Sequence, residues 1–218
     1  MTEATPIFTD TGWEPAEVYE HISRFEEVTG RTVVRLVSKH GTLPEYIRRQ
    51  RFFPNHGARY CTRMFKIEPM NAYLADKLPA TLNIALRADE PPDQRVGNLT
   101  EIDGLNIRYP LREWGLVRVD VVKVCIDNGL LPRYPPYMAR GGCEGCFYKR
   151  KSEVKALRFL KPDRFAQLKE LEAEVQDERG SFFHMFPNAG MSLSEMEAQP
   201  ALFDIAQTYA DAADTSDK

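Results

Sequence analysis

Short apolar segments alternate with amphipathic stretches along the first half of the chain. Residues 7–9, 32–37 and 81–86 are short and rich in apolar or β-branched side chains, which predicts three β-strands. Between Pro15 and Gly30, apolar side chains recur at intervals of three and four residues, which predicts an amphipathic helix. Strands separated by helices are typical of parallel sheets with right-handed crossovers. The fold class that we predict is therefore α/β, a parallel sheet flanked by helices.

The second half of the chain shows a different pattern. Helical periodicity returns in residues 152–160 and 163–178, where leucine, phenylalanine and valine form one apolar stripe. We therefore expect an α/β domain over residues 1–150 and a C-terminal helical extension over residues 151–209. The last residues, 210–218, are small and acidic, which is typical of a disordered tail.

Composition and charge narrow the function. The 218 residues are 43% hydrophobic and 28% charged, with a formal net charge of −3. This charge attracts neither nucleic acid nor an anionic membrane, so it does not support a nucleic-acid substrate. No apolar run reaches the ~20 residues of a membrane span, and the N-terminus lacks the pattern of a secretory signal. We expect a cytoplasmic protein, in which the four cysteines are metal ligands, reactive thiols or core residues rather than disulfides.

The first candidate site follows the first predicted strand. Asp10, Thr11 and Gly12 form a turn at its carboxyl end, and ligands of open α/β sheets bind beyond the carboxyl ends of the strands. Such a turn offers backbone N–H groups and a carboxylate to a ribose or an amine. The alternative is a plain connection from strand to helix, because Asp and Gly are ordinary turn residues.

The second candidate site is basic. Arg59, Arg63 and Lys66 are spaced by four and three residues at the start of a predicted helix, so they would share one helical face. Cations beside the free N–H groups of a helix N-terminus form a suitable phosphate or sulfate site. The alternative is a basic face that is simply solvated.

The third candidate site is a Cys-x-x-Cys motif. Cys143 and Cys146 are close enough in sequence to bind one metal or cluster, or to act together as a redox pair. One such motif does not complete a zinc site, and Cys61 is the best candidate for a third thiolate. Cys125 lies in an apolar predicted helix, where we expect a small core residue.

Five segments of the chain form an ordered set: Phe8-Thr9-Asp10-Thr11-Gly12-Trp13-Glu14-Pro15, Tyr60-Cys61-Thr62 with Lys66 and Pro69, Arg87-Ala88-Asp89-Glu90 with Arg95, Tyr109-Pro110-Leu111 with Trp114, and Gly142-Cys143-Glu144-Gly145-Cys146. Together they resemble the phosphoadenosine phosphosulfate reductase family of the adenine nucleotide alpha-hydrolase-like superfamily. The similarity is greatest to the actinobacterial and phage-type branch, and it covers roughly residues 7–181.

The resemblance assigns a nucleotide site. It implies that an adenine nucleotide, either ATP or phosphoadenosine phosphosulfate, binds against three groups of residues. The turn would border the adenosine, the basic helix would face phosphate or sulfate, and a later loop would cover the nucleotide. In that order the residues are Asp10, Thr11 and Gly12; Arg59, Arg63 and Lys66; and Arg87, Glu90 and Arg95.

The resemblance also assigns the cysteines. Cys61, Cys143 and Cys146 occupy positions that bind a four-iron iron–sulfur cluster in cluster-bearing relatives, with zinc as the alternative metal. The same three thiols are the candidate catalytic residues. Two family elements do not occur in the 218 residues: the Ser-Gly-Gly-x-Asp-Ser phosphate loop and the C-terminal Glu-Cys-Gly-x-His segment that carries the nucleophilic cysteine.

The resemblance implies adenine-nucleotide-dependent sulfur chemistry, either sulfonucleotide reduction or sulfur transfer. A thiol reductant protein and a second copy of the chain are the protein partners to expect. One alternative is ATP-dependent thiolation with a three-cysteine iron–sulfur cluster. Because the phosphate loop and the C-terminal cysteine are absent, another is a non-catalytic nucleotide-binding relic or phage accessory protein. A zinc-stapled structural domain is a further class.

Overall fold

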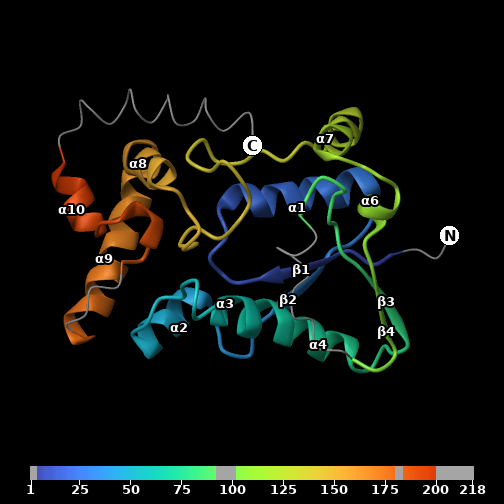
Figure 1. Cartoon of the computed structure of the whole chain (residues 1–218), viewed down its shortest axis with the longest axis horizontal. Coiled ribbons are helices and arrows are strands. Elements are labelled where there is room, and N and C mark those ends of the chain that lie inside the picture. The colour runs from blue at the N-terminus through green and yellow to red at the C-terminus, as the bar shows by residue number, and fades with distance from the viewer. Residues whose placement is uncertain (1–3, 92–101, 180–183, 200–218) are drawn as a thin grey trace.

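The strands of the molecule lie between helices. The structure is a computed structural model that describes residues 4–91, 102–179 and 184–199. In Figure 1 the first helix lies on one side of the first two strands, and the helical segment that follows them lies on the other. The strands are paired in parallel throughout the described chain. The predicted α/β class, with parallel strands and flanking helices, is confirmed.

The first strand pair follows the predicted pattern. β1 (Ile7–Asp10) pairs in parallel with β2 (Val34–Val37), and α1 (Ala16–Thr29) connects them. Pro15 precedes the first turn of α1, where its missing N–H costs nothing. Gly30 ends the helix in the left-handed conformation, with φ of 66°, and its N–H caps a carbonyl of the last turn.

The second strand pair is separate from the first. β3 (Ala80–Asn83) pairs in parallel with β4 (Leu105–Arg108). Within the described residues the four strands therefore form two two-stranded sheets rather than one continuous sheet. The prediction that residues 81–86 belong to one sheet with the first two strands is wrong, because within the described residues no backbone hydrogen bond joins β3 to β1 or β2.

A short helix follows β2. α2 (Leu43–Gln50) begins with a complete capping box, in which Thr42 and Glu45 exchange hydrogen bonds. Leu43 and Ile47, one turn apart, are fully buried. The arginines of its last turn face solvent.

A nearly continuous helical segment leads on to β3. It consists of α3 (Tyr60–Thr62), the π-helical turn η1 (Arg63–Ile67) and α4 (Glu68–Leu74). Pro69 sits in the first turn of α4, where its ring is tolerated. A π-turn inserts one extra residue per turn and is frequent at functional sites. The helix predicted to begin near Cys61 is present, but its spacing is not α-helical throughout.

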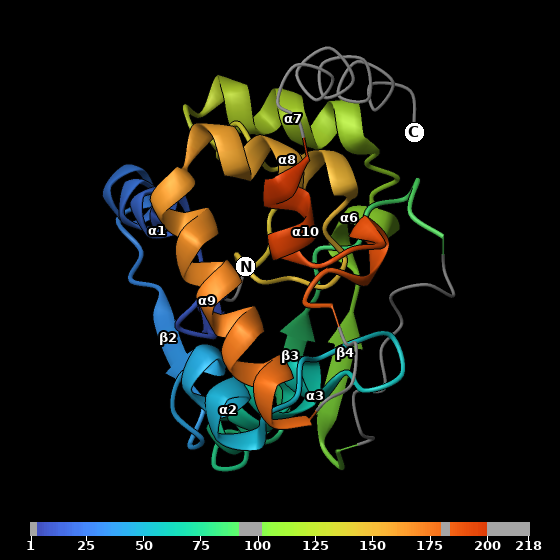
Figure 2. The same ribbon diagram turned by 90° about the vertical axis from the view of Figure 1, so that its left-hand side faces the viewer.

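The remaining helices follow β4 in the second half of the chain. They are α6 (Pro110–Glu113), α7 (Arg118–Asp127), α8 (Lys151–Leu160), α9 (Pro162–Arg179), η2 (Pro187–Ala189) and α10 (Leu193–Ala198). In Figure 2, α9 passes beside α2, and Glu174 of α9 accepts a hydrogen bond from Arg48 of α2 at 3.0 Å. No helix among the described residues is long and apolar enough to cross a membrane.

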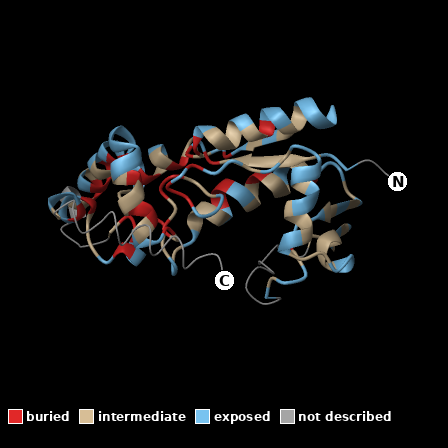
Figure 3. Ribbon diagram, turned by 90° about the horizontal axis from the view of Figure 1, so that it is seen from above, coloured by how far each residue is buried: buried red, intermediate tan, exposed pale blue. Residues whose placement is uncertain are grey.

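The hydrophobic core lies where α8, α9 and α10 pack against α2 and the π-helical turn. The buried residues in Figure 3 gather at that end of the molecule, whereas the end that carries β3 and β4 is mostly intermediate or exposed. Phe165, Leu168, Leu171 and Val175 are at most 3% exposed, which confirms the apolar stripe predicted for α9. Glu172 lies beside this stripe, and its carboxylate accepts the backbone N–H groups of Met185 and Leu193.

Candidate active site

A rigid turn ends β1. One carboxylate oxygen of Asp10 accepts the Gly12 N–H at 2.7 Å and the Tyr19 hydroxyl at 2.9 Å. Gly12 has φ of 69°, and a Cβ atom there would lie 2.5 Å from the Thr42 side chain. The turn therefore requires glycine, and it holds the Asp10 carboxylate at the carboxyl end of the strand.

A half-buried carboxylate, that of Glu14, accepts hydrogen bonds from the same turn. Glu14 Oε2 accepts the Thr11 hydroxyl at 2.7 Å, the Trp13 N–H at 3.1 Å and the Thr11 N–H at 3.3 Å. Burial raises the pKa of Glu14, although these hydrogen bonds and the Lys66 charge oppose the rise. Sequence reasoning did not select Glu14 as a site residue. The Thr-x-x-Glu spacing, which is that of a capping box, is the signal that could have found it.

The cysteine loop docks against this turn. The Glu144 N–H donates to the Trp13 carbonyl at 2.8 Å. Gly145 lies so close to the Trp13 indole that a Cβ atom there would be 1.8 Å from the ring. Trp13 is only 9% exposed, so the indole is fixed between the loop and the core. The Cys-x-x-Cys motif is thereby held beside the carboxyl end of β1.

The two cysteines of the motif interact directly. The Cys143 thiol donates a hydrogen bond to the sulfur of Cys146, which lowers the pKa of Cys146 to about 6. The Tyr148 N–H and the charges of Arg140 and Lys149 add to this effect, whereas burial opposes it. The same hydrogen bond and burial raise the pKa of Cys143. The pair therefore favours one thiolate held by the other thiol, and the nearby charges of Arg140 and Lys149 favour the thiolate on Cys146.

A buried lysine stands beside the pair. Lys149 is 3% exposed, and its Nζ atom has no hydrogen-bond partner among the described residues. The ammonium group lies 5.8 Å from the centre of the Tyr137 ring. Burial lowers the pKa of Lys149, while the nearby Glu153 carboxylate and the thiols of the motif raise it. The negative charges of Glu153, Glu144 and the thiolate therefore stabilise the buried ammonium group of Lys149.

Cys61 approaches the pair from α3. Its half-buried thiol has a pKa that is raised chiefly by burial, and the charges of Lys66 and Cys146 also act on it. The structure thus brings all three predicted cysteines into one electrostatic neighbourhood. Within the described residues, however, no group of three or more His, Cys, Asp or Glu side chains is arranged to hold a metal ion. The iron–sulfur cluster stays a prediction.

The three predicted basic residues, Arg59, Arg63 and Lys66, lie before and within the π-helical turn next to Cys61. Arg59 precedes α3 as its N-cap, and its guanidinium lies 5.7 Å from the centre of the Tyr148 ring. Arg63 and Lys66 belong to the π-helical turn, and all three basic side chains are exposed. The predicted α-helical spacing is kept from Arg59 to Arg63, whose N–H donates to the Arg59 carbonyl at 3.3 Å, but not from Arg63 to Lys66, which lie in the π-helical turn. Lys66 nevertheless acts electrostatically on Glu14 and on the thiols.

The loop after β3 is braced by its own side chains. Arg87 forms an ion pair with Asp89 at 2.9 Å and a longer one with Glu90 at 3.5 Å. Glu90 also accepts the Arg87 N–H through its side chain at 3.1 Å, and its carbonyl accepts from Arg112 at 2.6 Å. Arg95, which the resemblance placed on the same loop, lies outside the described residues.

Cys125 lies apart from the other cysteines, on α7. The prediction of a core position is wrong, because the side chain is half-buried and no residue of α7 is fully buried. Its neighbours Val124 and Ile126 are 54% and 56% exposed. The sequence of α7 is apolar, but the helix stays largely exposed because few of the described residues pack against it.

The sequence comparison identifies the family. A profile of the phosphoadenosine phosphosulfate reductase domain matches residues 1–124, which contain β1 to β4, the Asp10 turn and Cys61. The chain belongs to the phosphoadenosine phosphosulfate reductase family. Neither a curated protein nor a solved structure shows significant similarity to it. The Cys-x-x-Cys motif lies beyond the matched residues.

Proposed function

We propose that the protein carries out adenine-nucleotide-dependent sulfur chemistry, and that it reduces a sulfonucleotide with the Cys143–Cys146 pair. The observation that carries the proposal is the paired arrangement of the two thiols beside the Asp10 turn. One thiol donates to the other, and a buried lysine stands next to the acceptor. Dithiols in cationic surroundings react as nucleophiles at neutral pH. Family membership supports a sulfonucleotide as the substrate.

In the first step, the Cys146 thiolate attacks the sulfur of phosphoadenosine phosphosulfate. A bond forms between the two sulfur atoms, and the bond from sulfur to the bridging phosphate oxygen breaks. The electron pair of that bond leaves with adenosine bisphosphate, and the sulfonate group stays on Cys146. Cationic side chains near the leaving oxygens would stabilise the charge that develops there. Arg59, Arg63 and Lys66 are exposed at this edge of the molecule and are suited to that task.

In the second step, Cys143 acts as the resolving thiol. After losing its proton it attacks the sulfur of Cys146, sulfite leaves with an electron pair, and a Cys143–Cys146 disulfide forms. The dithiol supplies the two electrons that reduce the sulfate group to sulfite. A thiol reductant protein would then restore the dithiol for the next turnover. Cys61, whose thiol lies in the same neighbourhood, is the third candidate thiol for this exchange.

The nucleotide would bind on the Asp10 side of the pair. One oxygen of Asp10 is engaged by Gly12 and Tyr19, and the other accepts no hydrogen bond from the described residues. That second oxygen is suited to a ribose hydroxyl. The loop that carries Arg87, Glu90 and Arg95 would complete the site.

A second candidate function is ATP-dependent sulfur transfer with a three-thiol iron–sulfur cluster. It is favoured by one observation, the nearness of Cys61 to Cys146 that their electrostatic interaction indicates. Such a cluster would supply the sulfide for transfer to a substrate. The iron and acid-labile sulfide content of anaerobically purified protein tests this candidate, and zinc without iron would indicate a structural metal instead.

A single-turnover assay tests the leading proposal. Fully reduced protein, freed of external thiol, is mixed with phosphoadenosine phosphosulfate, and sulfite is measured. We expect about one sulfite per chain, because one dithiol supplies two electrons. Cys146→Ser should release none, while Cys125→Ser, at a thiol apart from the pair, should match the unaltered protein. Equal sulfite from Cys146→Ser would contradict the proposed nucleophile. No sulfite from any variant, with nucleotide still bound, would favour a non-catalytic binding protein.

A further inference from the structure

The chain around the cysteine pair is strongly basic. Residues 133–164 contain nine Lys or Arg and three Asp or Glu, a formal charge of +6, whereas the whole chain carries −3. Two of the three carboxylates, those of Glu144 and Glu153, are buried and add little negative charge to the surface. The Cys143–Cys146 pair therefore lies within a cationic part of a protein that is acidic overall.

Tyr148 holds two arginines beside the cysteine pair. The guanidinium groups of Arg59 and Arg140 lie 5.7 and 5.5 Å from the centre of its ring. Arg140 also donates a hydrogen bond to the Tyr148 carbonyl at 3.1 Å. The backbone N–H of the same tyrosine donates to the sulfur of Cys146. Tyr148 therefore links a reactive sulfur to two guanidinium groups, both on exposed residues.

Ring contacts hold Tyr148 in place. The His56 ring meets it edge-on, with 4.8 Å between the ring centres and 88° between the ring planes. Phe147, which is only 3% exposed, lies 4.4 Å away and anchors the cluster below the surface. We call His56, Arg59, Arg140 and Tyr148 the Tyr148 surface. Because its side chains are already positioned, a partner that binds there causes little loss of side-chain entropy.

No acidic side chain neutralises the two arginines of this surface. Among the described residues, neither Arg59 nor Arg140 forms an ion pair with a carboxylate. Guanidinium groups bind carboxylates and phosphates strongly, because they can donate two parallel hydrogen bonds. The Tyr148 surface is therefore suited to anionic groups from another molecule.

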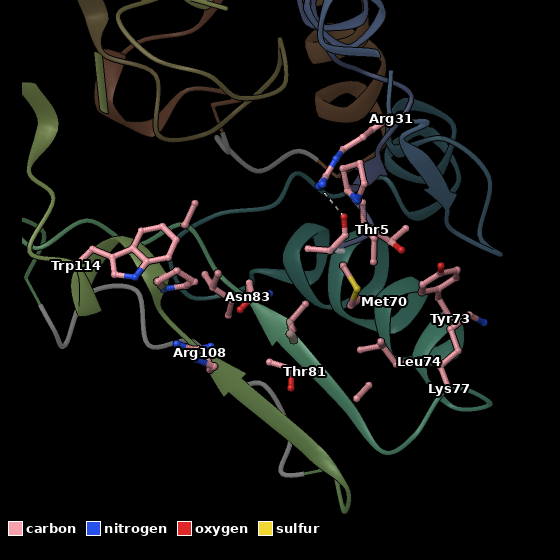
Figure 4. Close-up of a pocket in the computed structure, with 18 residues that line it drawn as sticks. Thr5, Arg31, Met70, Tyr73, Leu74, Lys77, Thr81, Asn83, Arg108 and Trp114 are labelled. Carbon is pink, nitrogen blue, oxygen red and sulfur yellow. Dashed lines mark hydrogen bonds between the residues drawn. The ribbon is translucent and has the colours of Figure 1, made fainter. Parts of the chain in front are cut away.

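The cations of the groove between the two strand pairs differ in this respect. The groove has a volume of about 1210 Å³, and Figure 4 shows Lys77 and Arg108 among the residues that line it. Arg108 forms an ion pair with Glu113, and the Lys77 Nζ atom lies 2.7 Å from Asp76. None of the candidate thiols lines the groove. Unpaired guanidinium groups and reactive sulfur therefore meet at the Tyr148 surface and not at the groove.

We propose that the Tyr148 surface docks the acidic face of a thiol reductant protein, which restores the Cys143–Cys146 dithiol. This inference rests on the proposed function, in which each turnover leaves the pair as a disulfide. The thiol of the partner must reach bonding distance of a half-buried sulfur, so the partner has to contact the residues around that sulfur. Those residues carry positive charge, and complementary charge makes the contacting face of the partner acidic.

The exchange needs two thiols from the partner. The first, as a thiolate, attacks one sulfur of the Cys143–Cys146 disulfide, so a bond forms between the two proteins. The bond within the pair breaks, and its electron pair leaves on the other sulfur. The second thiol of the partner, after losing its proton, attacks the bond between the proteins. The pair is released as a dithiol, and the partner has lost two electrons and carries the disulfide.

The surroundings favour an acidic protein over a nucleic acid. Arginine and tyrosine are enriched at the centres of protein–protein interfaces. A nucleic acid binds through a row of phosphates and needs cations along its length. Outside residues 133–164 the chain contains 20 Lys or Arg and 29 Asp or Glu, a formal charge of −9, which would repel phosphates beyond the Tyr148 surface. A folded partner with one acidic face contacts the cationic region alone.

Reduction of the oxidised full chain by charged dithiol peptides tests the docking surface. The Cys143–Cys146 disulfide is formed with diamide, the reagent is removed, and mass spectrometry confirms the pairing. Two synthetic probes share a Cys-Gly-Pro-Cys centre and carry glutamates or lysines at both ends. Each rate is divided by the rate of the same peptide with a small uncharged disulfide, which removes differences in thiol reactivity. We expect the glutamate peptide to be roughly tenfold faster at low salt, and the difference to narrow at high salt.

Two charge reversals locate the effect. Arg140→Glu should abolish the preference for the glutamate peptide, because it reverses a charge at the Tyr148 surface. The matched control is Arg118→Glu, which changes the net charge equally at an exposed position of α7, the helix that carries Cys125. This control should keep the preference. Equal normalised rates of the two peptides with the unaltered chain, or an equal loss of preference in both variants, would overturn the proposal.

The peptide test does not use the sulfonucleotide, because the disulfide is made chemically. A clear preference for the glutamate peptide, together with no sulfite in the single-turnover assay, would contradict the proposed reaction and support the docking surface. Sulfite release without a peptide preference would support the reaction and contradict the docking surface. A single-stranded oligonucleotide that blocks reduction by neutral dithiothreitol in the unaltered chain, but not in Arg140→Glu, would show that a nucleic acid occupies the surface and would overturn the assignment to a protein.

Discussion

Replacing Cys143 by alanine tests the thiol pair most sharply. The Cys143 hydrogen bond is the largest of the effects that lower the pKa of Cys146. A hydrogen bond to a charged group contributes about 1.5–3 kcal/mol, which corresponds to roughly 1–2 pKa units. In Cys143→Ala the pKa of Cys146 should therefore rise from about 6 to roughly 7–8. The remaining depression would come from the Tyr148 N–H and from Arg140 and Lys149.

The rate of alkylation by iodoacetamide reports this pKa, because only the thiolate reacts. At pH 6.5 the thiolate fraction of Cys146 should fall from roughly three quarters to between about 3% and 25%, so alkylation should slow roughly 3- to 25-fold. Mass spectrometry of the peptide that contains Cys146 follows the modification across pH. Cys125→Ala should leave the Cys146 profile unchanged. A midpoint that stays near 6 in Cys143→Ala, or one near 8.5 in the unaltered protein, would refute the reasoning.

Three further predictions concern the surroundings of the pair. Gly145→Ala would place a Cβ atom 1.8 Å from the Trp13 ring, so we expect a lower melting temperature and loss of the low Cys146 pKa, whereas Gly57→Ala, with its nearest atom at 3.5 Å, should change neither. Lys149→Met should raise the alkylation midpoint by up to about one pH unit, because a cation that favours the thiolate is lost. Glu172→Leu should cost roughly 2–6 kcal/mol in urea unfolding, since two buried N–H groups lose their acceptor at about 1–3 kcal/mol each.

The sequence predicts those helices and strands that are determined by their own residues. The strand at Ile7–Asp10, the helix ended by Gly30 and the stripe of α9 all follow from apolar spacing and from residues with fixed backbone preferences. Parallel pairing could also be predicted, because strands separated by helices require it. The candidate turn at Asp10 followed from its place after a strand.

Other features depend on contacts between distant segments. The π-helical turn that contains Lys66 alters a spacing that looks α-helical in sequence. The burial of Lys149 and the role of Glu14 depend on how the cysteine loop docks beneath Trp13, more than 100 residues away in sequence. α7 is exposed around Cys125 because few described residues pack against it. The sequence of the helix alone could not predict this. The groove between the sheets likewise appears only when both strand pairs are placed.

The most direct test of the thiol mechanism is to trap the sulfonate group. In Cys143→Ser the resolving thiol is absent, so phosphoadenosine phosphosulfate should leave one sulfonate on Cys146, seen by mass spectrometry of the intact chain and of the peptide. The adduct should disappear on addition of an external dithiol, with release of an equal amount of sulfite. An adduct on Cys61 instead, or a Cys143→Ser protein that binds the nucleotide and acquires no sulfonate, would contradict the assignment of Cys146 as the nucleophile.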